Sequence, residues 1–119
     1  MDGKLPDPGE VVWAWAPYEE DHGKGKTRPV LLIGYDGDWL LGVYLSSVDH
    51  DLDAKQEARE GRYWAKVGQG AWDSGGRVSF ARVDRIIRVN PKTISGRAER
   101  LDKSRFDKVA EAIKRHWSD

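Results

Sequence analysis

A charged loop between two apolar runs holds the residues of this sequence that are best suited to chemistry. The loop runs from Pro17 to Arg28 (PYEEDHGKGKTR) and contains acids, a histidine, lysines and glycines. An arginine guanidinium stays charged at every physiological pH and can bind two phosphate oxygens at once, which makes Arg28 a candidate for phosphate binding. Alternatively, Arg28 forms an ion pair with an acid of its own loop. The sequence leaves both interpretations open.

Two histidines are candidates for proton transfer, because the pKa of an imidazole lies near 6.5. His22 lies six residues before Arg28, and His50 follows Ser46 by four residues. A histidine in a polar loop is more often simply solvated, so neither is a strong candidate. The run DHDLD (49–53) contains possible metal ligands, but adjacent residues of an extended run point to opposite sides. We therefore predict no metal site.

Composition restricts the class of protein. The chain of 119 residues has no cysteine, which excludes disulfides and thiolate chemistry. The N-terminus lacks the features of a signal peptide and no segment is apolar enough to span a membrane, so we expect a cytoplasmic protein that does not bind membranes. The net charge is zero, but residues 1–76 are acidic and residues 77–119 are basic. We expect a basic face for a phosphate backbone; the alternative is an ordinary solvated surface.

The pattern along the chain predicts short strands and one clear helix. Residues 1–8 are expected to form a flexible leader before a single domain over 9–119. Asp36 to Asp38 predicts a hairpin turn, with Gly37 at positive φ, and Asp102 is a good N-cap for a terminal helix in which Leu101 packs against Phe106. We expect a strongly bent antiparallel sheet or barrel. The predicted strands are 11–16, 30–35, 39–45, 62–67, 78–80 and 83–89, with a short helix over 54–59.

The aromatic residues divide into core residues and residues that could stack on the bases of a nucleic acid. Tyr18 and Trp72 lie in polar or glycine-rich loops and could stack on bases, with Lys24 and Lys26 binding phosphates. Alternatively, Trp72 fills a gap beneath its loop. Three other tryptophans fit apolar faces and are expected in the core: Trp13, Trp39 and Trp117.

Four ordered stretches of the sequence resemble the blocks of the MazF/PemK family, the toxins of bacterial type II toxin–antitoxin pairs. They are GEVVW (9–13), GKTRPVLLI (25–33), LSS (45–47) and SFARVDRI (79–86). The resemblance spans about residues 9 to 117, and the loop before Arg28 looks like that of a PemK-like branch. A lone Arg-Pro pair would mean little, but four blocks in the family's order and similar spacing are specific.

The resemblance implies a fold that is mainly β: a small SH3-like barrel, as in MazF and CcdB toxins, with a C-terminal helix, usually forming a homodimer. It also implies an endoribonuclease (mRNA interferase) that cleaves single-stranded RNA without a metal or other cofactor and is inhibited by a cognate antitoxin. The family's catalytic arginine matches Arg28. Its assisting Thr or Ser matches Ser46, and the adjacent Ser47 is expected to contact RNA.

Metal-free RNA cleavage uses the 2′-hydroxyl as nucleophile, so the protein must accept a proton and stabilise a phosphorane. Arg28 suits the stabilisation, and Ser46 could donate a hydrogen bond to the same oxygens. Many family members have a glutamate five residues before the arginine, where this chain has Gly23, and the family's Asp-Gln pair reads Asp84-Arg85 here. The remaining candidates for the proton acceptor are acids further upstream: Glu20, which we choose, Glu19 and Asp21.

An alternative function on the same fold is binding without catalysis, to RNA or to an antitoxin. A gyrase poison like the CcdB toxins is disfavoured, because those proteins depend on a C-terminal Trp-Gly-Ile and this chain ends in HWSD (116–119). An antitoxin is usually acidic, and the basic second half of the chain provides a complementary surface.

Overall fold

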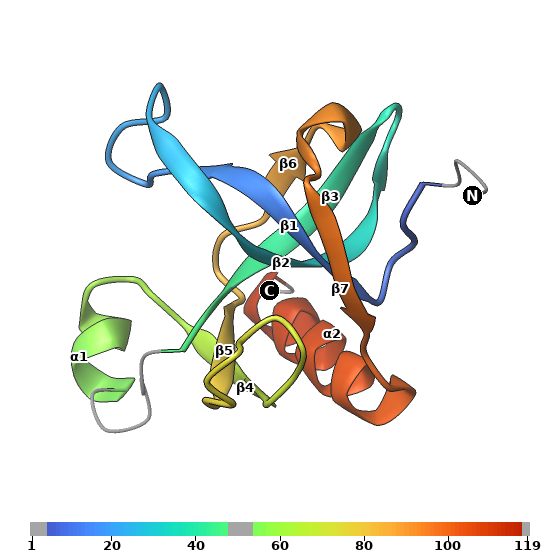
Figure 1. Cartoon of the computed structure of the whole chain (residues 1–119). Coiled ribbons are helices and arrows are strands. Elements are labelled where there is room, and N and C mark those ends of the chain that lie inside the picture. The colour runs from blue at the N-terminus through green and yellow to red at the C-terminus, as the bar shows by residue number, and fades with distance from the viewer. Residues whose placement is uncertain (1–4, 48–53, 118–119) are drawn as a thin grey trace.

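The computed structural model describes residues 5–47 and 54–117 (Figure 1). Within them the chain is mainly β with a C-terminal helix, which confirms the predicted fold class. The strands are β1 (Glu10–Pro17), β2 (Gly25–Asp36), β3 (Trp39–Ser46), β4 (Trp64–Gly68), β5 (Ser79–Arg82), β6 (Ile87–Val89) and β7 (Gly96–Arg100). The helices are α1 (Ala54–Arg59), the 3-10 turn η1 (Pro91–Thr93) and α2 (Lys103–Trp117).

The strands form one bent antiparallel sheet in the order β4–β5–β3–β2–β1–β7, and β6 pairs with β3. Strands β1 to β3 cross the middle of the molecule in Figure 1, with α2 beneath them and α1 to one side. Among the described residues the path of strand pairing is open, because β4 and β7 form its two ends. The predicted hairpin is confirmed: Asp36 pairs with Trp39, and Gly37 takes a φ of 62°.

The central strands are buried on both faces, so the core has two parts. On one side, Val11, Leu31 and Val43 pack with Val109 of α2. On the other side, Val12, Val30 and other apolar residues fill the interior of the bent sheet. Alternate residues of β1 therefore point into different parts of the core, which explains its almost unbroken apolar sequence.

Two of the three tryptophans expected in the core are exposed. Trp39 is 40% exposed and Trp117 is 55% exposed, so these predictions are wrong. Both lie at the end of an element, where apolar periodicity continues but no neighbouring element covers the side chain. Trp117 keeps a partner, because its indole N–H donates to the Val83 carbonyl at 3.0 Å. Trp13 is half-buried and packs against the first part of the core.

The terminal helix begins as its sequence predicts. Asp102 caps α2, since its carboxylate accepts the Arg105 backbone N–H at 3.2 Å and its carbonyl accepts that of Phe106. Leu101 is buried in the same cluster that Phe106 packs against. Helix α2 lies against β4, and no helix among the described residues is long and apolar enough to cross a membrane.

The basic second half of the chain forms ion pairs with the acidic first half. These pairs neutralise four arginines of the second half. In the segment predicted as a leader, Pro6 is buried and Asp7 accepts a hydrogen bond from the Tyr35 hydroxyl. The pairs are Arg82–Glu19, Arg88–Asp36, Arg97–Glu10 and Arg100–Asp7.

Candidate active site

Two clefts meet at Arg28. The first, of about 570 Å³, lies between β2, the end of β3 and the segment after β4. The second, of about 360 Å³, lies between the β1–β2 loop and the residues around Tyr44. Lys26 and Arg28 line both clefts. A ligand strand that passes from one cleft to the other therefore crosses the Arg28 guanidinium.

Arg28 is held against an aromatic ring rather than paired with an acid. Its guanidinium carbon lies 4.2 Å from the centre of the Tyr44 ring, a cation–π distance. Its Nε is buried and has no hydrogen-bond partner among the described residues, and none of them forms an ion pair with Arg28. The alternative of an ion pair within the loop is therefore not observed in this part of the chain. A buried donor without a partner is costly.

Ser46 and Ser47 lie beside Arg28 in the first cleft. The β2–β3 ladder positions them, because Val30 pairs with Tyr44 and the two strands continue antiparallel towards Arg28 and Ser46. Ser46 also pairs with Phe80 of β5, which fixes the end of β3. The structure thus places the predicted arginine and both serines around one cleft.

The β1–β2 loop is closed by its own hydrogen bonds. The Tyr18 N–H donates to the Lys24 carbonyl at 2.8 Å, and the Asp21 carboxylate accepts the Gly23 N–H at 3.0 Å. Asp21 therefore stabilises the turn. His22 and Lys24 are exposed and line neither cleft, and His50 lies outside the described residues.

The other two acids of the loop have different surroundings. Glu19 is bound to Arg82, and this hydrogen bond, more than any other cause, lowers the pKa of its carboxyl. Glu20 lines the second cleft with Tyr18 and Arg28 and makes no hydrogen bond or ion pair within the described part of the chain. Of the three candidate proton acceptors, Glu20 alone is both in a cleft and unengaged among these residues.

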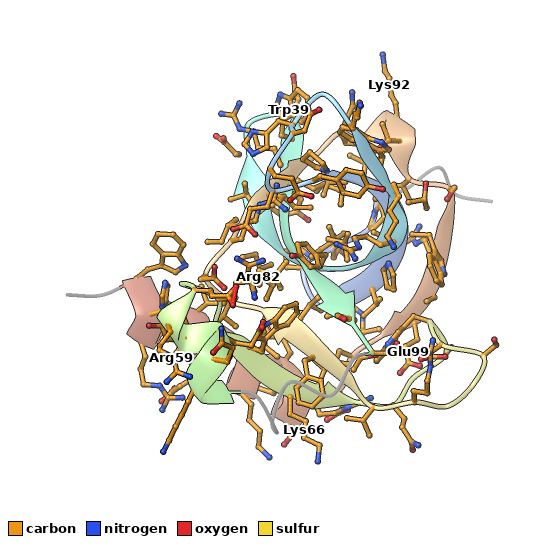
Figure 2. The ribbon with its side chains drawn as sticks, turned by 90° about the vertical axis from the view of Figure 1, so that its left-hand side faces the viewer. Trp39, Arg59, Lys66, Arg82, Lys92 and Glu99 are labelled. Atoms are coloured by element: carbon orange, nitrogen blue, oxygen red, sulfur yellow. The ribbon has the colours of Figure 1, made fainter. Side chains whose placement is uncertain are left out.

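Sequence reasoning missed Arg82, the buried centre of this site. Only 2% of its side chain is exposed. Its position is labelled in Figure 2. It donates to Asp84 at 2.6 Å, to Glu19 at 2.9 Å and to the Tyr44 hydroxyl at 2.8 Å. Burial acts to lower the pKa of Arg82, but the hydrogen bonds to Asp84 and Glu19 outweigh it and raise that pKa. Arg82 thereby connects the β1–β2 loop to the ring beneath Arg28.

The expected stacking role of Trp72 is contradicted by its burial. Its side chain is only 3% exposed, and its indole N–H donates to the buried Ser79 hydroxyl at 2.9 Å. Gly70 lies so close to the ring that a Cβ would not fit there, so the gap-filling alternative is correct. The residue lines the first cleft only with its remaining surface.

No group of three or more histidine, aspartate or glutamate side chains that could hold a metal ion occurs in residues 5–47 and 54–117. The acidic run at 49–53 lies outside the described residues. The side chains that line the two clefts are instead mainly cationic, hydroxylic and aromatic. This set suits an anionic, base-containing ligand.

Solved structures with the same fold include MazF from Deinococcus radiodurans. It is 19% identical to this chain with a TM-score of 0.62, and the match covers 98% of this chain and 99% of that one. A MazE–MazF structure from the same organism is 15% identical with a TM-score of 0.63, covering 95% and 96%. An endoribonuclease from a mycobacterial species is 12% identical with a TM-score of 0.60, covering 97% and 93%.

No curated protein sequence matches the chain. The structural likenesses establish a shared fold, because all three identities are low. A family model described as PemK-like, MazF-like toxin of type II toxin–antitoxin system matches residues 7–117. With nearly its whole length matched, the chain belongs to this family of toxins.

Proposed function

We propose that this protein is an endoribonuclease toxin that cleaves single-stranded RNA, without a metal, through the RNA's own 2′-hydroxyl. The observation that carries the proposal is Arg28: a guanidinium without an acidic partner among the described residues, held on Tyr44 where two clefts meet. Family membership and the endoribonuclease among the structural relatives support it.

The residues around Arg28 suit two tasks of this reaction, the removal of a proton and the stabilisation of charge. Glu20 accepts the proton of the 2′-hydroxyl, whose oxygen then attacks the adjacent phosphorus. Arg28 stabilises the charge of the phosphorane, and Ser46 donates a hydrogen bond to its oxygens. The bond to the 5′-oxygen breaks, and that oxygen takes up a proton. The products carry a 2′,3′-cyclic phosphate and a 5′-hydroxyl.

We further propose that the protein acts in the cytoplasm as a homodimer and is inhibited by an acidic antitoxin. One of the similar structures contains both MazE and MazF. In this chain Lys26 and Arg28 have no ion-pair partner among the described residues, so an acidic segment can compete with RNA for them. Antitoxin binding is then expected to weaken with salt.

The experiment is cleavage of a long single-stranded RNA in the presence of a chelator. Defined fragments with cyclic phosphate ends are expected, and a 2′-deoxy substitution at the mapped site should prevent the cut. Arg28→Ala should lower the rate by about 10²- to 10³-fold, the usual cost of removing one donor to a developing oxyanion. Ser46→Ala should lower it less.

Arg88→Ala is the matched control, because Arg88 is an exposed arginine beside Trp39. Figure 2 shows Trp39 at the end of the sheet away from Arg82. The control variant should cleave at the wild-type rate. RNA that is bound tightly but never cut would overturn the enzymatic proposal and favour the binding protein. Full activity in folded Arg28→Ala would exclude the assigned mechanism.

A further inference from the structure

Arg85 is a second arginine of the site without an ion-pair partner among the described residues, and neither the family motif nor our sequence reasoning gave it a role. It follows β5, is half-buried and lines the second cleft with Arg28 and Lys26. Its guanidinium carbon lies 5.9 Å from the centre of the Tyr44 ring. Tyr44 therefore lies within cation–π distance of two arginines.

The other two arginines of the second cleft are already engaged. Arg62 forms ion pairs with Glu57 and Glu60, and Arg82 binds Glu19. Arg85 forms no hydrogen bond or ion pair within residues 5–47 and 54–117. The hydrogen bond from Arg82 is the main cause that lowers the pKa of Glu19, and the charge of Arg85 adds to it. Both carboxylate oxygens of Glu19 nevertheless accept hydrogen bonds from Arg82 and none from Arg85. The donors of Arg85 remain available to a ligand.

The ligand that suits this position is a phosphodiester. A guanidinium binds two oxygens of one phosphate in a fork, and the Tyr44 ring limits where the fork can point. Arg28 and Arg85 are held by the same ring, so they can meet neighbouring phosphates of one strand. With five basic and three acidic side chains, the second cleft favours an anion.

The position of Glu20 gives the strand a direction; this step rests on the proposed function. The 2′-hydroxyl that attacks belongs to the nucleotide on the 5′ side of the scissile phosphate. Glu20 lines the second cleft, so that nucleotide must enter this cleft for Glu20 to accept its proton. We propose that the second cleft binds the nucleotide on the 5′ side of the cut, and that Arg85 binds this nucleotide's own 5′-phosphate.

Binding of an RNA that cannot be cut tests the inference separately from catalysis. The probe is a short fluorescent RNA that spans a mapped cut site and carries a 2′-deoxy sugar there, with affinity measured by anisotropy over a range of salt. Arg85→Gln should weaken binding several-fold and reduce the slope of log K against log salt by about 0.7, the contribution of one single-strand phosphate. Arg88→Gln, which neutralises an exposed arginine away from the cleft, should leave the slope unchanged.

Neutral methylphosphonate linkages then identify the phosphate. Neutralising the phosphate 5′ of the scissile one should weaken wild-type binding but have little further effect on Arg85→Gln. The inference would be overturned if this neutral linkage weakened binding equally in wild type and Arg85→Gln, or if Arg85→Gln kept the wild-type salt slope. It would also be overturned if neutralising the phosphate on the 3′ side gave the expected pattern instead. Circular dichroism and a urea midpoint near that of wild type establish that Arg85→Gln is folded. If the wild type neither binds nor cuts RNA, the proposed function itself has failed.

Discussion

Replacing Arg82 by methionine should destabilise the protein strongly, because it leaves a buried carboxylate without its cation. Only 8% of the Asp84 side chain is exposed, and without Arg82 its one remaining partner among the described residues is the Tyr63 N–H. Removing one member of a buried ion pair costs about 3–5 kcal/mol. Glu19 is 51% exposed and can regain water, so the lower end, about 3 kcal/mol, applies here.

Urea unfolding followed by tryptophan fluorescence measures this loss. At a slope of about 1.5 kcal/mol per molar, 3 kcal/mol moves the midpoint by about 2 M. Arg88→Met is the control, because it makes the same substitution at an exposed arginine. Its free energy of unfolding should stay within about 0.5 kcal/mol of wild type. The double variant Arg82→Met/Asp84→Asn should recover part of the loss, since it also removes the buried charge.

A wild-type midpoint for Arg82→Met would refute this reasoning, and so would a double variant less stable than Arg82→Met alone. The first result would mean that the hydrogen bonds of Arg82 only offset the cost of its burial. The second would mean that methionine itself does not fit among Tyr44 and its neighbours. Either result would also remove the reason to regard Arg82 as the residue that positions the ring beneath Arg28.

Three further predictions follow from single contacts. The pKa of Glu19 is lowered by Arg82, so Glu19→Gln should be slightly less stable than wild type at pH 7, by about 0.5 kcal/mol or less given its exposure. This difference should shrink as the pH falls below the ordinary glutamate value of 4.5, and a difference that persists at pH 2 would contradict it. Trp72→Phe should lower the free energy of unfolding by about 1–2 kcal/mol, because it leaves the buried Ser79 hydroxyl without its donor; thermal unfolding measures this. The variant should keep the wild-type affinity for RNA, and a loss of affinity without a loss of stability would restore the stacking role. Gly42→Ala should cost about 1–3 kcal/mol, because the new Cβ would lie 2.5 Å from Val30 Cγ1, and an unchanged melting temperature would show that β2 can shift.

Much of the fold could be predicted because its signals are local. Three such signals each involve only a few residues: the alternation of side chains along β1, the turn at Gly37 and the helix cap at Asp102. Strand β7 was missed because its sequence, GRAER, has no apolar run. It forms by pairing with β1, and Arg97 is held by Glu10 from the other end of the chain. A strand stabilised by a distant edge and an ion pair leaves little trace in its own sequence.

The residues of the site also divide into those with a local sequence signal and those that depend on distant residues. Arg28 and Ser46 could be found from short motifs, and the structure places them around one cleft. Arg82 could not be found, because an arginine at a strand end is usually a surface residue. One of the two carboxylates that pair with it belongs to Glu19, which lies 63 positions away. Trp72 was misjudged because neighbouring glycines suggested an exposed loop, whereas the position of Ser79 decides the burial.

The pairing of β1 with β7 also determines when the protein becomes complete during synthesis. The hydrogen bond between Arg97 and Glu10 spans 87 positions, and β7 covers the outer edge of β1. A nascent chain that stops before Gly96 therefore presents that edge unpaired, together with acids whose arginines have not yet been made. Such an edge is a template for extended peptides, including other nascent copies. The chain thus acquires its finished sheet only after its last strand leaves the ribosome.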